Sequence, residues 1–188
     1  MFATIVDAKS SFTASHSHRV AAVARVLAAA AGLDEDRARL VGVAALLHDI
    51  GKLRVPDAVL DKQGGLDVGE RCTMVRHAFD TWQILSRIEG FEEISKWAAF
   101  HHECVDGCGH PFGIRGSELA LESRIVAVAD VFQALRQDRP YRGRMALEQT
   151  MSVIDGMVLT GKLDPGIVEI LKDELDACDE AAVSDGAC

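Results

Sequence analysis

Residues 34–51 read DEDRARLVGVAALLHDIG. Asp34 is suited to the N-cap of a helix, because its side-chain oxygen can accept a hydrogen bond from a free backbone N–H group of the first turn. Apolar residues then recur at helical spacing as far as Leu47. The segment therefore predicts a helix that ends in two adjacent polar residues, His48 and Asp49.

Helical signals of the same kind occur along most of the chain. Asp67 and Glu70 have the spacing of a capping box, and Asp164-Pro165 has the order of a cap followed by a first-turn proline. Strand alternation, an internal repeat and a linker are not evident. We predict an all-α bundle of about seven helices, which forms one domain over residues 1–178 with a flexible tail at 179–188. The expected helices are 15–31, 34–49, 68–87, 92–102, 121–135, 145–159 and 165–177.

Composition narrows the class of protein further. The 188 residues are enough for one domain with a proper core. The sequence lacks both an uninterrupted apolar run of about 18 residues and a signal peptide, so we expect no membrane contact and a cytoplasmic location. The net charge of −9 argues against binding to polymeric nucleic acid. Five irregularly spaced cysteines are typical of reduced thiols, and the pair Cys104 and Cys108 has no second pair to complete a four-thiolate metal site.

The histidines are distributed unevenly, since all seven lie between positions 16 and 110. His48-Asp49 alone would be weak evidence for a metal site, because such pairs are common at helix ends. Asp130, however, interrupts an apolar helical segment, and a buried carboxylate is costly unless a cation or strong donors compensate it. His101-His102 forms a second adjacent pair, and His77 is expected in the middle of a helix. Imidazole and carboxylate ligands without thiolate predict borderline divalent ions such as iron, manganese, zinc or nickel.

Several motifs, in this order, resemble the HD-GYP family of metal-dependent phosphohydrolases. They are His16-Ser-His-Arg-Val-Ala, Leu-Leu-His48-Asp49-Ile-Gly-Lys52, Pro56-Asp57-Ala-Val-Leu60, His101-His102-Glu103, Arg124-Ile-Val-Ala-Val-Ala-Asp130-Val-Phe132 and Asp138-Arg139-Pro140-Tyr141-Arg142. The resemblance extends from about residue 7 to residue 171. It implies an HD-type helical bundle around a buried centre of two or three metal ions.

The resemblance also implies roles for particular residues. His16, His48, Asp49 and Asp130 would hold one metal ion, and Asp49 would bridge to a second ion held by His77, His101 and His102. Two divalent transition metals are expected, iron or manganese, with zinc or nickel as alternatives. Asp49 and Lys52 would be catalytic, with Lys52 on the scissile phosphate. The other expected substrate-binding residues are His110, Arg139 and Arg142.

Three positions depart from the family pattern. The signature Gly-Tyr-Pro is Gly109-His110-Pro111, Phe12 stands where some members have a glutamate for a third metal, and Gln133 replaces a common aspartate. These changes predict an intact metal centre and an altered substrate pocket. Because an imidazole with an ordinary pKa gains charge near pH 6.5, His110 would add a cation and favour the linear dinucleotide pGpG.

The function implied is hydrolysis of cyclic di-GMP, of its linear product pGpG, or of both, in bacterial second-messenger signalling. Two alternatives stay open at this point. The domain is either an HD-type hydrolase of another nucleotide or phosphate ester, or a non-catalytic module that binds a nucleotide or a partner protein. A homodimer and a regulatory partner are both compatible with the sequence.

Overall fold

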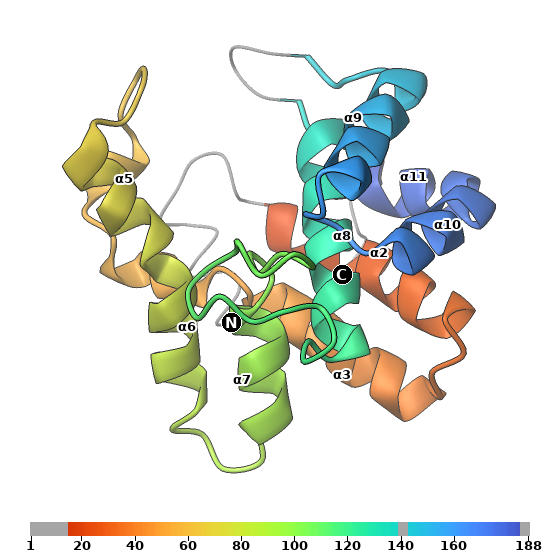
Figure 1. Cartoon of the computed structure of the whole chain (residues 1–188), viewed down its shortest axis with the longest axis horizontal. Helices are drawn as coiled ribbons and strands as arrows, with labels where there is room; N and C mark the ends of the chain where they lie inside the picture. Colours follow the sequence, from red (N-terminus) through yellow and green to blue (C-terminus); the bar gives the residue numbers. More distant parts are fainter. Residues whose placement is uncertain (1–14, 139–142, 185–188) are drawn as a thin grey trace.

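A computed structural model describes residues 15–138 and 143–184, and this part of the chain contains helices, turns and loops but no strand. The expected all-α fold is confirmed. The elements, in chain order (Figure 1), are α2 (His16–Ala30), α3 (Glu35–Leu47), the 3-10 helix η1 (Ile50–Arg54), α4 (Asp57–Leu60), α5 (Val68–Val75), α6 (His77–Leu85), α7 (Glu92–Ala99), α8 (Leu121–Arg136), α9 (Leu147–Leu159), α10 (Pro165–Asp173) and α11 (Leu175–Val183).

Three aspartates cap helices as their sequence positions predict. Asp34 accepts a hydrogen bond from the Arg37 N–H group at 2.8 Å, and Asp164 accepts one from the Ile167 N–H group at 3.1 Å. Asp67 forms a complete capping box, since its side chain accepts from the backbone of Glu70 while the Glu70 side chain accepts from the backbone of Asp67. These caps satisfy backbone donors that a helix start leaves free, and so fix where α3, α5 and α10 begin.

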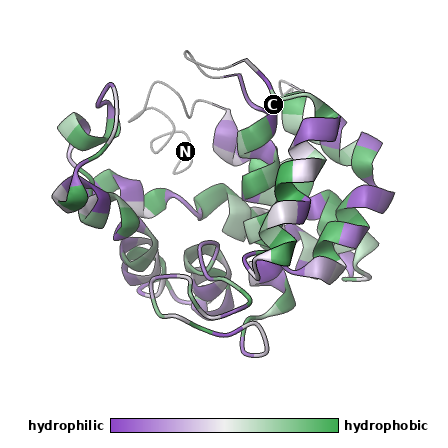
Figure 2. Cartoon of the chain, turned by 45° about the horizontal axis from the view of Figure 1, so that its top comes forward, coloured by the Kyte–Doolittle hydropathy of each residue, from purple (hydrophilic) through white to green (hydrophobic). Residues whose placement is uncertain are grey.

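The core lies where α2, α3, α8 and α11 meet. Val23 of α2, Val41 of α3 and Phe132 of α8 are fully buried, as is Ala182 of α11. Hydrophobic and hydrophilic residues alternate along most of the helices (Figure 2), which is the pattern of helices with one face on a core. The core therefore provides a rigid support for side chains that project from α2, α3 and α8.

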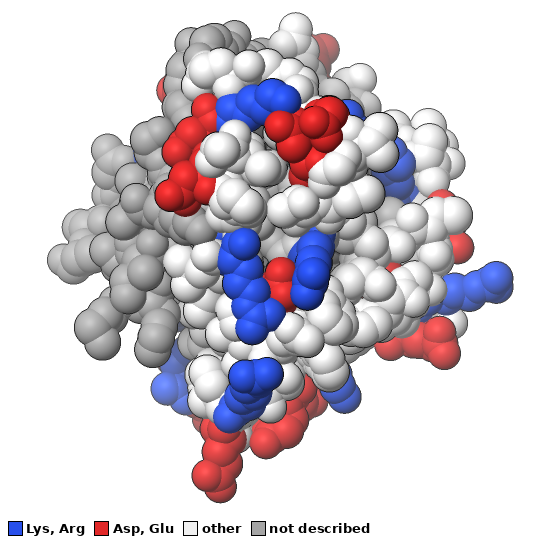
Figure 3. Space-filling model, turned by 90° about the vertical axis from the view of Figure 1, so that its left-hand side faces the viewer, with Lys and Arg blue, Asp and Glu red and all other residues white. Residues whose placement is uncertain are grey.

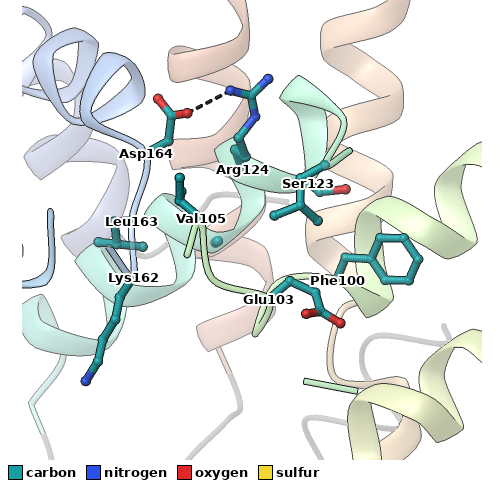
Figure 4. Close-up of a pocket in the computed structure, with 10 residues that line it drawn as sticks. Phe100, Glu103, Val105, Ser123, Arg124, Lys162, Leu163 and Asp164 are labelled. Carbon is teal, nitrogen blue, oxygen red and sulfur yellow. Dashed lines mark hydrogen bonds and ion pairs between the residues drawn. The ribbon is translucent and has the colours of Figure 1, made fainter. Parts of the chain in front are cut away.

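Ion pairs tie the C-terminal helices to α8. Arg124 Nη1 donates to Asp164 Oδ2 at 2.7 Å, so the residue that caps α10 is also held by α8 (Figure 4). Arg136 Nε donates to Asp179 Oδ1 at 2.6 Å. Because the Arg136 side chain is only 6% exposed, the second pair lies in a partly dry environment and fixes α11 against α8.

The elements on the left of Figure 1 are more exposed. Neither α4 nor α5 contains a buried residue. On the face that α5 and α6 present (Figure 3), basic and acidic side chains are interspersed. Asp80, which is 4% exposed, accepts from Arg54 Nη1 at 2.7 Å and lies 3.7 Å from Arg76 Nε. This shared carboxylate ties η1 to α6.

Some helix boundaries differ from the sequence prediction. The helix expected over 68–87 is divided at Arg76 into α5 and α6, and at this break the Met74 carbonyl accepts a hydrogen bond from the His77 imidazole. The expected helix 165–177 is likewise divided, at Glu174. Residues 179–183, which the sequence analysis assigned to a tail, continue α11, since Ala182 packs into the core.

Candidate metal centre

The structure brings together all seven side chains that the sequence predicts as metal ligands. His16 begins α2, Asp130 lies in α8, and His77 is the first residue of α6 and not a mid-helix residue as expected. The other four follow the last residues of α3 and α7. The side chains form three groups, and within each group the potential ligand atoms lie within 4.8 Å of one another. The groups are His16, His48 and Asp49; His48, His101 and Asp130; and His77, His101 and His102.

Asp49 lies between these groups and directs one oxygen to each side. Its Oδ2 atom is 3.3 Å from His48 Nε2 and 4.0 Å from His16 Nε2. Its Oδ1 atom is 3.3 Å from His77 Nε2. A carboxylate in this position can bridge two cations, one on each oxygen.

Asp130 completes the group on the core side. Its Oδ1 atom lies 3.3 Å from His16 Nε2 and 3.7 Å from His48 Nε2. Burial disfavours the charged form of Asp130, but a hydrogen bond from His16 and the charge of His48 hold the pKa of Asp130 well below its usual range. Burial also raises the pKa of Asp49, but the charges of His48 and Lys52 outweigh burial and hold that pKa well below its usual range. Two ionised carboxylates therefore lie within 4.0 Å of the same His16 nitrogen.

Backbone carbonyls orient three of the imidazoles. Nδ1 of His48, of His77 and of His101 lies 2.6, 2.6 and 2.7 Å from the carbonyl oxygen three residues earlier in the chain. A carbonyl can only accept, so each Nδ1 carries the proton and, in the neutral ring, Nε2 presents a lone pair to the centre. This is the usual way in which proteins orient metal-binding histidines.

The distance between two of these Nε2 atoms bears on whether the site fits a metal ion. His77 Nε2 and His101 Nε2 are 3.5 Å apart. His77 Nε2 also lies 3.3 Å from Asp49 Oδ1, so two imidazole nitrogens and a carboxylate oxygen converge at this point. A divalent cation would be coordinated by such a set of donors, so the residues present fit a metal ion.

Two of the imidazoles are in the protonation state that binds metal. Burial, and then the neighbouring His102, hold the pKa of His101 well below its usual range. Burial also lowers the pKa of His102 to about 4. Both rings are therefore neutral at pH 7, as metal coordination requires. At His48, by contrast, the Asp49 carboxylate outweighs burial and raises the pKa to about 9. The two carboxylates thus attract positive charge to the core side of the site.

Gln133 supports His16 from one helical turn beyond Asp130. Its Oε1 atom accepts a hydrogen bond from His16 Nδ1, which leaves His16 Nε2 facing Asp130 and Asp49. The sequence analysis noted Gln133 as a departure from the family pattern but gave it no role. The neutral amide keeps the acceptor that an aspartate would supply, without its charge.

Lys52 lies at the rim of the centre. Its Nζ atom donates to Asp49 Oδ2 at 2.5 Å, and its side chain is 25% exposed. Lys52 lies within the short helix η1. The ammonium group is therefore placed beside the bridging carboxylate, on a short structured element, with part of its surface open to a ligand.

Gly51 allows η1 to approach α6 very closely. A Cβ atom at position 51 would lie 1.9 Å from the His77 carbonyl oxygen and 2.6 Å from the Thr81 nitrogen. The Gly51 N–H group donates to Thr81 Oγ1 at 3.0 Å, and that hydroxyl donates to the His48 carbonyl at 2.9 Å. Thr81, which sequence reasoning missed, thus links the His48 and His77 sides of the site.

The loop that follows His102 carries the remaining predicted residue that the structure describes. The His110 ring lies 4.9 Å from the His102 ring, between centroids. Burial, and then the charge of His77, hold the pKa of His110 below its ordinary value. A lowered pKa disfavours the charged imidazole on which the expected added cation depends. Phe12, Arg139 and Arg142 lie outside the described residues.

Comparison with known proteins identifies the family. The HD domain family matches residues 1–167. The chain belongs to the HD domain family. The expected family is thereby confirmed, and with it a centre of histidine and aspartate groups able to hold metal ions.

Relatives of this HD domain are named as phosphodiesterases. The chain is 41% identical over 171 residues to the 3'3'-cGAMP-specific phosphodiesterase 1 of Vibrio cholerae, covering 91% of the chain and 40% of that protein. It is 37% identical over 172 residues to the cyclic di-GMP phosphodiesterase response regulator RpfG of Xanthomonas campestris, covering 90% of the chain and 45% of that protein. The chain thus spans less than half the length of these relatives.

A solved structure supports the fold of this HD domain. The HD domain of the Listeria monocytogenes phosphodiesterase PgpH, in complex with cyclic-di-AMP, superposes with a TM-score of 0.71 at 21% identity and covers 100% of this chain and 99% of its own. At that identity the likeness shows the fold alone. Among the described helices, none has the length and apolar character needed to cross a bilayer.

Proposed function

We propose that this HD domain is a metal-dependent phosphodiesterase that hydrolyses cyclic dinucleotides. The observation that carries the proposal is the position of Asp49, whose two oxygens face the His48 and His77 sides of a buried ligand cluster. One metal ion would be held by His16, His48, Asp49 and Asp130, and a second by Asp49, His77, His101 and His102. Iron and manganese are the proposed metals, with zinc and nickel as alternatives for this donor set.

When bound, two divalent ions a few ångströms apart lower the pKa of a water molecule and neutralise charge on a phosphodiester. The residues of this chain supply the rest. The carbonyl-bound imidazoles are held in one orientation, so little reorganisation is needed when a substrate arrives. Lys52, beside Asp49, would donate to a non-bridging phosphate oxygen. Arg139 and Arg142 are proposed to neutralise the other phosphate charge.

The substrate class is proposed from the relatives. They are named for 3'3'-cGAMP and for cyclic di-GMP, and both ligands are cyclic dinucleotides made of purine nucleotides. The linear product pGpG is kept as a further proposed substrate. The lowered pKa of His110 weakens the electrostatic reason for preferring it, because an uncharged imidazole adds no attraction for a terminal phosphate. We therefore propose that the cyclic substrates are cleaved at least as fast as pGpG.

The test uses protein purified without air or chelator. Metal content is measured, and kcat/KM is determined for cyclic di-GMP, 3'3'-cGAMP and pGpG. Two metal ions per chain and hydrolysis of at least one cyclic dinucleotide are expected, and activity should disappear after chelation and return with iron or manganese. Tight binding without hydrolysis in metal-loaded protein would instead indicate the non-catalytic binding module, and cleavage of pGpG alone would remove the proposed preference.

A further inference from the structure

Phe112, in the loop after His102, has an unusual environment for an exposed aromatic residue. Its side chain is 45% exposed, yet it contacts three other aromatic rings. The centroid distances are 5.9 Å to Phe79, 5.7 Å to Trp82 and 5.5 Å to Phe100. Phe79 and Trp82 belong to α6, and Phe100 follows α7. The exposed ring is therefore the outermost member of an aromatic cluster and not an isolated surface residue.

The angles within this cluster leave the faces of the Phe112 ring without a parallel partner. The interplanar angles are 59° to Phe79, 83° to Trp82 and 73° to Phe100. The pairs with Trp82 and Phe100 meet edge to face and the pair with Phe79 is tilted, whereas stacking requires nearly parallel planes. The three neighbours thus brace the ring without stacking on it, and 45% of the residue's surface stays exposed.

Glu103 holds the backbone of Phe112 in place. Its carboxylate is 3% exposed and accepts from the Phe112 N–H group at 2.7 Å and from the Ile114 N–H group at 3.0 Å. Charge-assisted bonds of this kind, made in a buried position, are stronger than ordinary hydrogen bonds. Figure 4 shows Phe100 and Glu103 on the walls of one narrow pocket. The backbone and the ring of Phe112 are therefore both fixed before a ligand arrives.

The loop that carries this braced ring also approaches the metal centre. His110, whose ring is 4.9 Å from that of the proposed ligand His102, precedes Phe112 by only two residues. Two residues span at most about 7 Å, so Phe112 is within reach of a nucleotide whose phosphate lies at the metals. Phe112 is the one Phe, Tyr or Trp residue of the loop 103–116, and it is exposed.

We infer that Phe112 forms a nucleobase subsite, in which a purine of the bound dinucleotide stacks on its exposed ring. The inference rests on the proposed function for the identity of the ligand. Stacking suits this position because it needs an accessible, oriented π-face and no hydrogen-bond partner. A subsite of this kind takes guanine and adenine alike, and so accommodates cyclic di-GMP and 3'3'-cGAMP.

The experiment measures binding and turnover separately. Trp82, 5.7 Å from Phe112, is a built-in fluorescence reporter. Stopped-flow fluorescence on the metal-loaded protein gives the Kd of cyclic di-GMP before turnover, with ribose 5-phosphate, which has no base, as a competing probe of the phosphate site. The variants are Phe112→Leu, which keeps apolar volume without a π-face, and Phe112→Tyr, which keeps the ring. Leu159→Ala, at an 88% exposed position of α9, is the matched control.

Phe112→Leu should weaken cyclic di-GMP binding about 5- to 150-fold, the effect of losing one base–aromatic stack, while leaving ribose 5-phosphate unchanged. Phe112→Tyr should bind within about 3-fold of the wild type, and the control should be unaffected. The inference would be overturned if Phe112→Leu weakened the binding of cyclic di-GMP and of ribose 5-phosphate equally, or if Phe112→Tyr failed to bind cyclic di-GMP. Unchanged binding in Phe112→Leu, with an active wild type, overturns it while the proposed function stands. A wild type that binds but does not hydrolyse, with weak binding by Phe112→Leu, supports the subsite and refutes the hydrolysis.

Discussion

The two sides of the ligand cluster are built differently. His16, His48 and Asp130 belong to or follow the long helices α2, α3 and α8, which pack around the core, and this side also contains two ionised carboxylates. His77 and the pair His101 and His102 lie at the ends of the shorter helices α6 and α7. Asp49 Oδ1 is 3.3 Å from His77 Nε2, and His101 also belongs to a group with Asp130. The core side therefore has more negative charge and should bind a cation more tightly. Occupancy of the other side should depend on Asp49.

The largest effect is expected from Asp49→Ala, which removes the carboxylate whose two oxygens face the His48 and His77 sides. Metal content should fall towards zero, and kcat/KM should fall by more than about 100-fold, beyond the usual cost of losing an outer-shell partner. Metal analysis and the hydrolysis assay measure both. Circular dichroism should still show a helical protein.

Two companion variants test whether the two sides are unequal. Asp130→Ala should lower metal content without abolishing it, because the His77 side keeps its four ligands. Asp36→Ala, an exposed aspartate of α3, should change neither quantity. Retention of both metals by Asp49→Ala would refute the bridging role.

Lys52→Ala tests a residue that belongs to neither side. Its kcat/KM should drop by about 10–1000-fold, as expected for one charged contact in the transition state, while metal content stays unchanged. Lys172→Ala, a surface lysine paired with Glu169 and Asp155, is the control. If the Lys52 variant loses metal, the ammonium group acts on the centre and not on the substrate.

Gln133 offers a way to weaken the core side alone. Gln133→Leu keeps the volume but leaves His16 Nδ1 without an acceptor, so the affinity of that side for metal should fall by about 10- to 100-fold. Gln133→Glu retains an acceptor oxygen and should restore affinity. Calorimetric titration of metal into the apoprotein distinguishes the binding of the tighter metal ion from that of the weaker one. If Gln133→Leu weakened only the second, weaker binding step, His16 would belong to the weaker metal site and not to the core side.

The last comparison concerns two thiols and has no effect on activity. Cys72 on α5 is exposed, whereas Cys178 on α11 is fully buried, and burial raises the pKa of its thiol to about 12. Three units above the ordinary value correspond to about 1000-fold less thiolate near neutral pH. Mass spectrometry after brief alkylation at pH 8 should find Cys72 modified and Cys178 protected until the protein is unfolded. Equal rates would show that α11 opens readily.

Sequence patterns predicted the local features of this fold well. The caps at Asp34, Asp67 and Asp164 depend on residues three positions apart, and α8 follows from a continuous apolar segment. Asp130 and the paired histidines were singled out because a buried carboxylate is costly without a cation, whereas the complete ligand set, with His16, was implied by the resemblance to the HD-GYP family. Local signals therefore sufficed for most of the helices, and the family resemblance supplied the composition of the site.

Contacts between distant residues escaped the same reasoning. Gln133 and His16 are 117 positions apart, and the bond from Gly51 to Thr81 joins separate elements. The division of the helix at Arg76 also depends on tertiary structure, because it accompanies the turn of His77 towards the centre. The lowered pKa of His110 depends on burial that only the folded chain creates.

The close approach at Gly51 has a consequence for mutational surveys. In a scan that replaces every residue and scores activity, Gly51 should tolerate substitution as poorly as Asp49, although it supplies no ligand atom. Even alanine would bring a methyl group within 1.9 Å of the His77 carbonyl oxygen and force η1 away from α6. Intolerance at neighbouring positions 49 and 51 would thus have unrelated chemical and steric origins, and only a scan scored in parallel for folded protein could separate them.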